Sequence, residues 1–108
     1  MDELTILVKG SSADPYETTF IKDASSLTAL CSCPAGSFGN FCKHRIAILD
    51  GDAGAVLEED VKKVPTVVEW LAGTDVEAAL AELREAESRK DKDAMATAKR
   101  KLARAMNS

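Results

Sequence analysis

The chain has 108 residues and a mass of 11.5 kDa, which is the size of one domain and argues against a multidomain enzyme. Its composition is 45% hydrophobic and 30% charged, as in globular proteins, but only 5% of its residues are aromatic. A small chain with few bulky side chains buries a modest core, so we expect an additional cross-link, which its cysteines could supply.

The net charge of -4 is distributed unevenly along the chain. Residues 1–83 carry 6 basic and 14 acidic side chains, whereas residues 84–108 carry 8 basic and 4 acidic ones. A basic end on an acidic body is typical of a nucleic-acid contact, a docking element or the solvated face of a helix. Because the pI is near 5.0, the solvated face is the favoured interpretation, and binding of DNA by the whole surface is not expected.

We expect a cytoplasmic protein with no membrane partner. The sequence has no run of 18 apolar residues, and residues 1–4 lack the basic flank and apolar stretch of a secretory signal. Three cysteines, an odd number, in a reducing compartment argue against a disulfide framework.

The first part of the chain predicts three β-strands, at residues 4–8, 16–22 and 26–33. Their β-branched and aromatic residues favour extended backbone, and clusters of turn-forming residues separate them. The second and third strands should pair as an antiparallel hairpin. Pro34 ends the third strand, and residues 34–41 form a loop with two glycines.

The rest of the chain predicts helices. A helix of about two turns should begin near Cys42 and end at Leu49, before Asp50-Gly51. Residues 51–108 should be mostly helical and end in a basic helical hairpin, whose first helix opens with a capping box from Thr74 to Glu77. The residues expected to face the core from this hairpin are Val76, Ala79, Leu80, Leu83, Ala86, either Ala94 or Met95, Ala98, Leu102 and Ala105.

One short segment contains every cysteine and the only histidine of the chain: Cys31, Cys33, Cys42 and His44. Three thiolates and one imidazole are the ligand set of a structural, tetrahedral zinc site. Residues i and i+2 of a strand point to the same side, so Cys31 and Cys33 can face one ion. In a helix such residues diverge, so Cys42 should lie at or before the helix start, with His44 in the first turn.

Other chemistries for these residues are less favoured. A disulfide between Cys31 and Cys33 would close a very tight ring. A nucleophilic pair of Cys42 and His44 would leave two cysteines unexplained, and a catalytic zinc would need an open position in place of a fourth protein ligand. We therefore expect one structural Zn²⁺.

The order Cys-x-Cys, eight residues, Cys-x-His resembles the SWIM zinc finger. The flanks agree, with apolar Leu27 and Leu30 before the motif, Pro34 after the second cysteine and apolar residues after His44, so the resemblance covers about residues 16–50. It implies a strand pair followed by a helix, with the three cysteines and His44 as ligands. The family occurs in chromatin-remodelling ATPases, Mutator-like transposases, signalling kinases and prokaryotic proteins, where it is regarded as a module for binding DNA or proteins.

Two weaker features have ordinary explanations. Asp50 to Gly54 begins like a calcium loop, but residues 55 and 61 are not the glycine and glutamate that such a loop needs, so we expect a turn. Phe38 and Phe41 could stack on bases, but they more plausibly cover the metal site and the first helix.

The expected fold is therefore α+β: a small antiparallel sheet leads into a zinc-stapled ββα corner at residues 1–50, and a mostly helical half follows at 51–108. The favoured function is a non-enzymatic adaptor for protein–protein interaction, because no carboxylate pair, phosphate loop or nucleophile arrangement stands out. The alternative is a nucleic-acid-binding protein. We expect a protein or DNA partner and no small-molecule substrate, and the sequence does not specify an oligomeric state. The candidate nucleic-acid contacts are Lys43, Arg45, Lys99, Arg100, Lys101 and Arg104.

Overall fold

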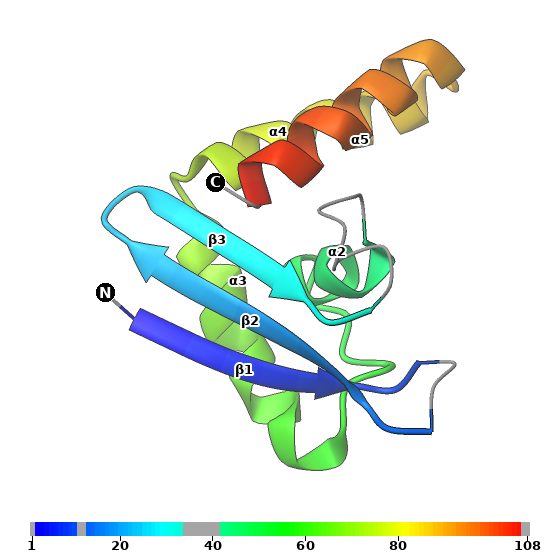
Figure 1. The fold of residues 1–108 in the computed structure, drawn as a ribbon. Helices are drawn as coiled ribbons and strands as arrows, with labels where there is room; N and C mark the ends of the chain where they lie inside the picture. The colour runs from blue at the N-terminus through cyan, green and yellow to red at the C-terminus, as the bar shows by residue number, and fades with distance from the viewer. Residues whose placement is uncertain (1, 11–12, 34–41, 107–108) are drawn as a thin grey trace.

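The computed structural model describes residues 2–10, 13–33 and 42–106. Three strands come first and helices follow, so the expected α+β class is confirmed (Figure 1). In chain order the elements are β1 (Asp2–Val8), β2 (Tyr16–Asp23), β3 (Ser26–Cys31), α2 (Lys43–Leu49), the 3-10 helix η1 (Glu58–Lys63), α3 (Val64–Leu71), α4 (Asp75–Ser88) and α5 (Lys92–Met106).

The sheet is an antiparallel meander in the order β1-β2-β3. Alternate side chains of each strand are buried on one face, as a two-residue period requires. This face is covered by α3, which lies behind the sheet in Figure 1, and by α2, which lies next to the end of β3. Its buried residues are Ile6 and Val8 from β1, Thr18 and Phe20 from β2, and Leu27, Ala29 and Cys31 from β3.

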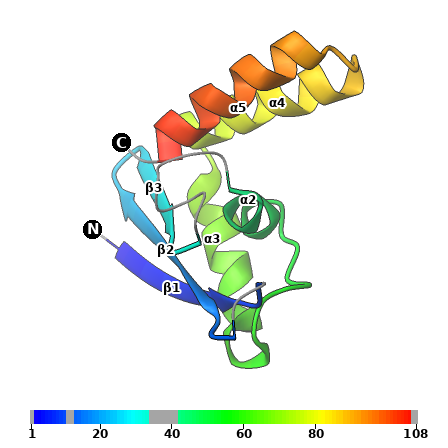
Figure 2. The same ribbon diagram turned by 45° about the vertical axis from the view of Figure 1, so that its right-hand side comes forward.

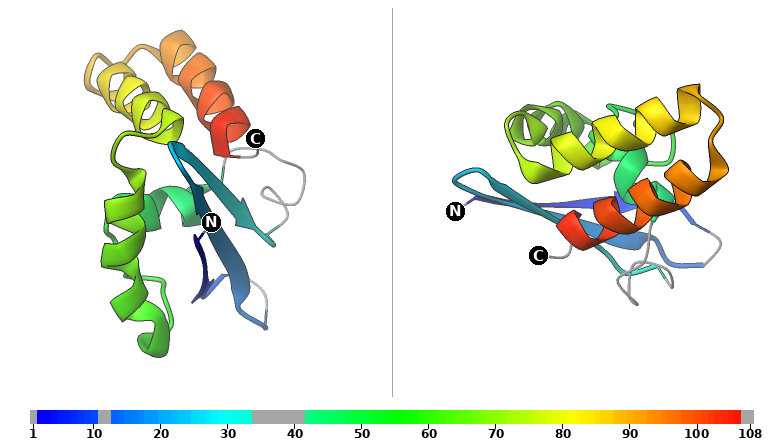
Figure 3. Two further views of the ribbon diagram at one scale, coloured as in Figure 1. Left: turned by 90° about the vertical axis from the view of Figure 1, so that its left-hand side faces the viewer. Right: turned by 90° about the horizontal axis from the view of Figure 1, so that it is seen from above.

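Helices α4 and α5 form an antiparallel hairpin beside β3 (Figures 2 and 3). Thr74 caps α4 as expected, because its Oγ1 accepts a hydrogen bond from the backbone N–H of Glu77 at 3.3 Å. The carboxylate of Glu77 reaches back to the N–H of Gly73 at 3.0 Å, one residue earlier than in an ideal capping box. The predicted core residues of α4 are all buried: Val76, Ala79, Leu80, Leu83 and Ala86.

The buried face of α5 includes more residues than the sequence predicted. Ala98 and Leu102 are buried, Ala94, Met95 and Ala105 are half-buried, and Ala103 and Met106 are buried as well. The last turn of α5 packs against β3 in addition to α4, so two of its faces are covered. A single stripe of apolar residues could not reveal this second contact.

One cluster of buried side chains joins the sheet to α3, α4 and α5. It includes Ile6 and Phe20 from the strands, Val67 from α3, Leu83 from α4 and Leu102 from α5, each at most 1% exposed. The predicted boundary near residue 50 marks a change of secondary structure, and the core extends across it.

The segment before η1 borders the free edge of β1. The backbone N–H of Lys9 donates to the carbonyl of Ala55 at 2.8 Å, and the N–H of Leu57 donates to the carbonyl of Leu7 at 3.0 Å. Such contacts protect an edge strand from pairing with another chain. Within the described parts of the chain, no helix has the length and hydropathy needed to cross a membrane.

Candidate metal centre

The end of β3 positions the first two cysteines. Cys31 pairs with Thr18 across the sheet, and Thr18 pairs with Ile6, so these three side chains form one row on the buried face. Thr18 is fully buried, and its hydroxyl donates to the carbonyl of Ile6 at 2.6 Å. The row therefore fixes the position of the Cys31 side chain relative to the central strand β2.

The residue between the two cysteines points away from them, as expected. Ser32 is exposed, and its backbone N–H donates to the carbonyl of Glu17 at 3.0 Å. The N–H of Glu17 donates in return to the hydroxyl oxygen of Ser32 at 2.9 Å. These two bonds continue the pairing of the strands one residue beyond β3, so Cys31 and Cys33 are held on the same side of extended backbone.

The start of α2 positions the other two side chains, and the expected placement is confirmed. Cys42 is the N-cap residue, with extended backbone at φ -131° and ψ 117°, and His44 lies in the first turn. The side chain of Cys42 makes no capping hydrogen bond to the helix, so its sulfur lies beside the free N–H groups of the first turn. The position at the start of α2 thus directs Cys42 toward the other candidate ligands.

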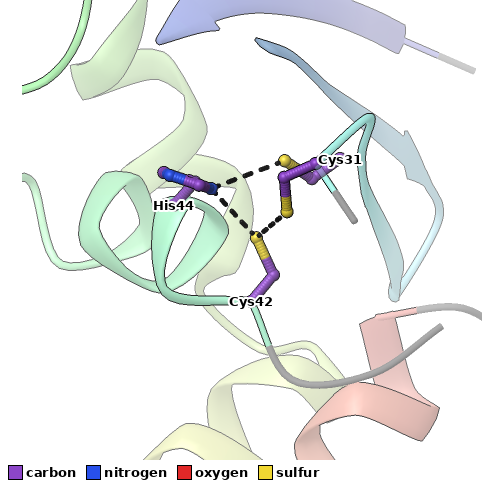
Figure 4. Close-up of side chains that lie close together, drawn as sticks. Cys31, Cys42 and His44 are labelled. Atoms are coloured by element: carbon purple, nitrogen blue, oxygen red, sulfur yellow. Dashed lines mark hydrogen bonds between the residues drawn. The ribbon is translucent and has the colours of Figure 1, made fainter. Parts of the chain in front are cut away.

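The four side chains converge on one point, and Figure 4 shows Cys31, Cys42 and His44 pointing toward one another. Their candidate ligand atoms all lie within 4.8 Å of one another. The sulfurs of Cys33 and Cys42 are 3.3 Å apart, and Nδ1 of His44 lies 3.5 Å from the sulfur of Cys42 and 3.8 Å from that of Cys31. All three cysteines are buried, and His44 is half-buried.

These distances fit a zinc ion. Zinc bonds of 2.3 Å to sulfur and 2.0 to 2.1 Å to nitrogen place tetrahedral ligands about 3.8 Å apart for two sulfurs and about 3.6 Å apart for sulfur and nitrogen. Four protein ligands fill the coordination sphere and leave no position for a reacting water. The Cys₃His cluster therefore fits one structural zinc ion, with Nδ1 as the histidine donor.

The thiols perturb one another because they share hydrogen bonds in a buried site. The pKa of Cys42 is lowered to about 4, first by a hydrogen bond from the thiol of Cys31, while burial opposes the shift. The pKa of Cys31 is raised, first by that same hydrogen bond and then by burial. The thiol of Cys42 thus becomes a thiolate, the form that binds metal, more readily than the thiol of Cys31.

The histidine ring has an aromatic neighbour. The rings of Tyr16 and His44 lie 5.3 Å apart between centroids, at an interplanar angle of 47°. Tyr16 also packs against the cysteine cluster from the start of β2. This tilted contact restricts the orientation of the ligand ring, and it could not be anticipated from a sequence separation of 28 residues.

Residues 16–50 match the family model of the SWIM zinc finger. This segment is a SWIM zinc finger. It begins in β2 and ends at Asp50, the C-cap of α2, so β1 and the helices from η1 to α5 lie outside the match. No curated protein and no solved structure matches the chain significantly.

One candidate nucleic-acid contact of the SWIM zinc finger lies in the protein interior. Lys43 is exposed, but Arg45 is 0% exposed, and its Nη1 donates to the carbonyl of Ala29 on β3 at 2.7 Å. Arg45 is therefore unsuited to contact a phosphate. It lies on the face of α2 that packs against the sheet, which the sequence analysis did not recognise because charged residues rarely occupy such positions.

The remaining basic candidates lie on α5. Arg100, Lys101 and Arg104 are exposed, and Lys99 is half-buried. The ammonium group of Lys101 pairs with the carboxylate of Glu82 on α4 at 3.3 Å. The basic residues of α5 therefore lie on the helical hairpin, whereas Lys43 lies on α2 beside the candidate metal ligands.

The two weaker features of the sequence have different outcomes. Phe38 and Phe41 lie outside the described residues. The turn after α2 uses its carboxylates internally, because Asp50 pairs with Arg84 of α4 and Asp52 accepts a hydrogen bond from the N–H of Gly54 at 2.8 Å. These partners agree with the expected turn.

Proposed function

We propose that the chain is a non-enzymatic, zinc-dependent adaptor that binds another protein through a pocket beside the SWIM zinc finger. The observation that carries the proposal is an apolar cavity of about 210 Å³ next to His44. Its lining residues are Val8, Lys43, His44, Ala47, Ile48, Asp52, Ala55 and Val56.

The size of this pocket favours an apolar side chain as the occupant. Pockets for small-molecule ligands usually enclose about 300 to 1,000 Å³, more than this pocket offers. The buried side chains of Val8, Ile48 and Val56 contribute its apolar surface, and Lys43 and Asp52 supply one charge of each sign. An apolar anchor flanked by polar contacts is the usual arrangement at protein–protein interfaces.

The pocket depends on the metal through α2. Four of its lining residues, Lys43, His44, Ala47 and Ile48, belong to this seven-residue helix, and the metal ligands lie at the start of the helix. Isolated helices of this length are unstable in water, so the zinc and the sheet must hold it. Removing zinc should therefore remove the binding surface. The thiolate ligands also need a reducing compartment, which supports a cytoplasmic location.

The alternative is a nucleic-acid-binding protein, favoured by the exposed cations of α5. Arg100 and Arg104 are four residues apart and so lie on one side of the helix. The buried Arg45 and the ion pair of Lys101 with Glu82 reduce the number of cations available to phosphate. Because affinity for phosphate depends on gathering several cations, this observation weakens the alternative.

The test of the adaptor compares two alanine-to-arginine variants. Ala55 lines the pocket and Ala81 lies on α4, and both are exposed. A partner captured from the native host is purified and titrated by calorimetry against the zinc-loaded chain. We expect Ala55→Arg to weaken binding about tenfold or more, as loss of an interface anchor does, and Ala81→Arg to leave binding unchanged.

The same proteins are titrated with random-sequence duplex DNA over a series of salt concentrations. Affinity that falls steeply with salt, is lost in Arg100→Gln/Arg104→Gln and is unaffected by Ala55→Arg would replace the adaptor with the nucleic-acid alternative. No measurable binding at low salt eliminates that alternative.

A further inference from the structure

We propose that Arg45 is the electrostatic counter-charge of the zinc centre, so that its buried guanidinium strengthens zinc binding and makes the bound thiolates less reactive. The proposal goes beyond the adaptor function, because it concerns how the metal centre is stabilised and not what binds beside it.

The occupied centre carries excess negative charge. Three thiolates and a neutral imidazole around Zn²⁺ leave a net charge of about -1. Water would solvate this charge at an exposed site, but Cys31, Cys33 and Cys42 are only 6%, 4% and 2% exposed. A charge in such an environment is costly unless the protein supplies an opposite charge close by.

Few side chains near the ligands in sequence can supply that charge. Between Ala24 and Leu49 the only Lys, Arg, Asp or Glu residues are Lys43 and Arg45, both cationic and both adjacent to His44. Their environments are opposite, because Lys43 is exposed and Arg45 is 0% exposed. Water and salt screen the charge of Lys43, whereas the charge of Arg45 acts through the protein interior.

The structure holds the guanidinium beside the strand that carries the first ligand. Nη1 of Arg45 donates to the carbonyl of Ala29, and Ala29 and Cys31 lie on the same buried face of β3. Two residues along a strand span about 7 Å, which places the cation about two residues along the strand from Cys31. Arg45 also follows His44 directly in the first turn of α2, and Cys42 is the N-cap of that helix. Because arginine stays protonated, this positive charge is permanent.

The test compares three zinc-loaded variants with the wild-type chain. Arg45→Gln removes the charge and keeps a hydrogen-bond donor, Arg45→Lys keeps the charge, and Lys43→Gln removes the exposed charge on the other side of His44. Zinc dissociation constants are measured by competition with a chromogenic chelator. Alkylation of the zinc-loaded protein by iodoacetamide, followed by mass spectrometry, reports thiolate reactivity.

We expect Arg45→Gln to raise the zinc dissociation constant about tenfold or more and to speed alkylation, because a nearby opposite charge is lost from a poorly screened site. Lys43→Gln should change both quantities by no more than about twofold, and Arg45→Lys should stay within about threefold of the wild type.

Two results would overturn the proposal. If Arg45→Lys is as defective as Arg45→Gln, the residue acts by its shape and hydrogen bond and not by its charge. If Arg45→Gln and Lys43→Gln have equal effects, burial gives Arg45 no special role. Should Arg45→Gln fail to fold with zinc, Arg45→Lys decides: near-wild-type zinc affinity supports the counter-charge, and defective binding refutes it.

Discussion

The carboxylate of Asp60 accepts a hydrogen bond from the backbone N–H of Leu7 at 2.9 Å, across 53 positions of the sequence. Its other oxygen pairs with the ammonium group of Lys63 at 3.0 Å, and Lys63 donates to the carbonyl of Thr5 at 3.1 Å. Asp60 and Lys63 are three residues apart on η1, and their side chains bond an N–H and a carbonyl group of β1. The backbone of a fourth strand would make the same kind of bonds. The edge is thereby blocked without a further strand.

Replacing Asp60 should destabilise the protein. Asp60→Ala leaves the N–H of Leu7 without its acceptor and removes the partner of Lys63, so we expect the free energy of unfolding at pH 7 to fall by about 1 to 3 kcal/mol. Glu59→Ala is the matched control, because Glu59 is an exposed acidic residue of the same 3-10 helix. Urea unfolding of both variants measures the difference, and equal losses would contradict this role for Asp60.

The contribution of Asp60 should also depend on pH. The N–H of Leu7 and then Lys63 lower the pKa of Asp60 below its ordinary value of 3.8 in the folded state. A carboxyl group with a depressed folded pKa stabilises the protein above its unfolded pKa and loses this effect as the pH falls through the folded value. The difference between wild type and Asp60→Ala should be constant from pH 7 to about 5 and shrink below about 4. A difference that grows on acidification would refute this assignment.

The metal centre predicts a stoichiometry. Elemental analysis should find one zinc per chain, and Cys42→Ala should bind it far more weakly because the sphere loses a thiolate. Free energies of roughly 10 to 16 kcal/mol for structural zinc sites match or exceed the usual 5 to 15 kcal/mol stability of a domain. Adding a strong chelator should therefore abolish the β-sheet signal in circular dichroism, and restoring zinc should recover it.

No cysteine can serve as a matched control for Cys42→Ala, because all three cysteines are candidate ligands. Ser32→Ala is the control instead. Ser32 is exposed between two ligands, and its hydroxyl oxygen accepts a hydrogen bond from the backbone N–H of Glu17. This variant should keep full zinc occupancy. A chain that stays fully folded without metal would contradict the structural role of zinc.

The cap of α4 predicts a local effect on stability. Thr74 is 5% exposed, accepts a hydrogen bond from the N–H of Glu77 and donates to the carbonyl of Leu71 at 2.7 Å. Thr74→Ala should cost about 1 to 2 kcal/mol, the usual range for loss of an N-cap. Thr97→Ala, at an exposed position within α5, should cost less than about 0.5 kcal/mol. Denaturant midpoints of the two variants decide the comparison.

The shared core predicts cooperative unfolding of the two halves. Leu102 is 0% exposed and belongs to the cluster that joins α5 to the sheet. Leu102→Ala should cost about 2 to 5 kcal/mol and lower the melting of sheet and helices together. Leu30→Ala, at a position 41% exposed on β3, is the control and should have a small effect. Separate transitions for the zinc corner and the hairpin would show that they are independent units.

The features that were predictable from the sequence are encoded locally. Two cysteines with one intervening residue on a strand, and a cysteine and histidine spanning a helix start, determine where their side chains point. The Thr74 cap and the apolar stripe of α4 likewise depend on residues within a few positions of one another. These rules predicted the convergence of the four candidate ligands and the starts of α2 and α4.

The features that were missed depend on contacts between distant segments. Arg45 looked like a surface cation because its burial results from the approach of α2 to the edge of β3, which no local pattern encodes. The bond between Asp60 and Leu7 and the ring contact of Tyr16 with His44 have the same origin. Met106 is buried because the end of α5 meets the sheet as well as α4.

The alignment of Ile6, Thr18 and Cys31 in one row links the metal to the choice between alternative strand pairings. A shift of β3 by a single residue would turn its side chains over, carrying Cys31 and Cys33 to the opposite side of the sheet from His44. Such a slipped hairpin could not complete the coordination sphere. During folding, zinc binding would therefore stabilise only chains whose strands pair in the native register. Chains with the slipped pairing would lack this stabilisation and could unpair and fold again.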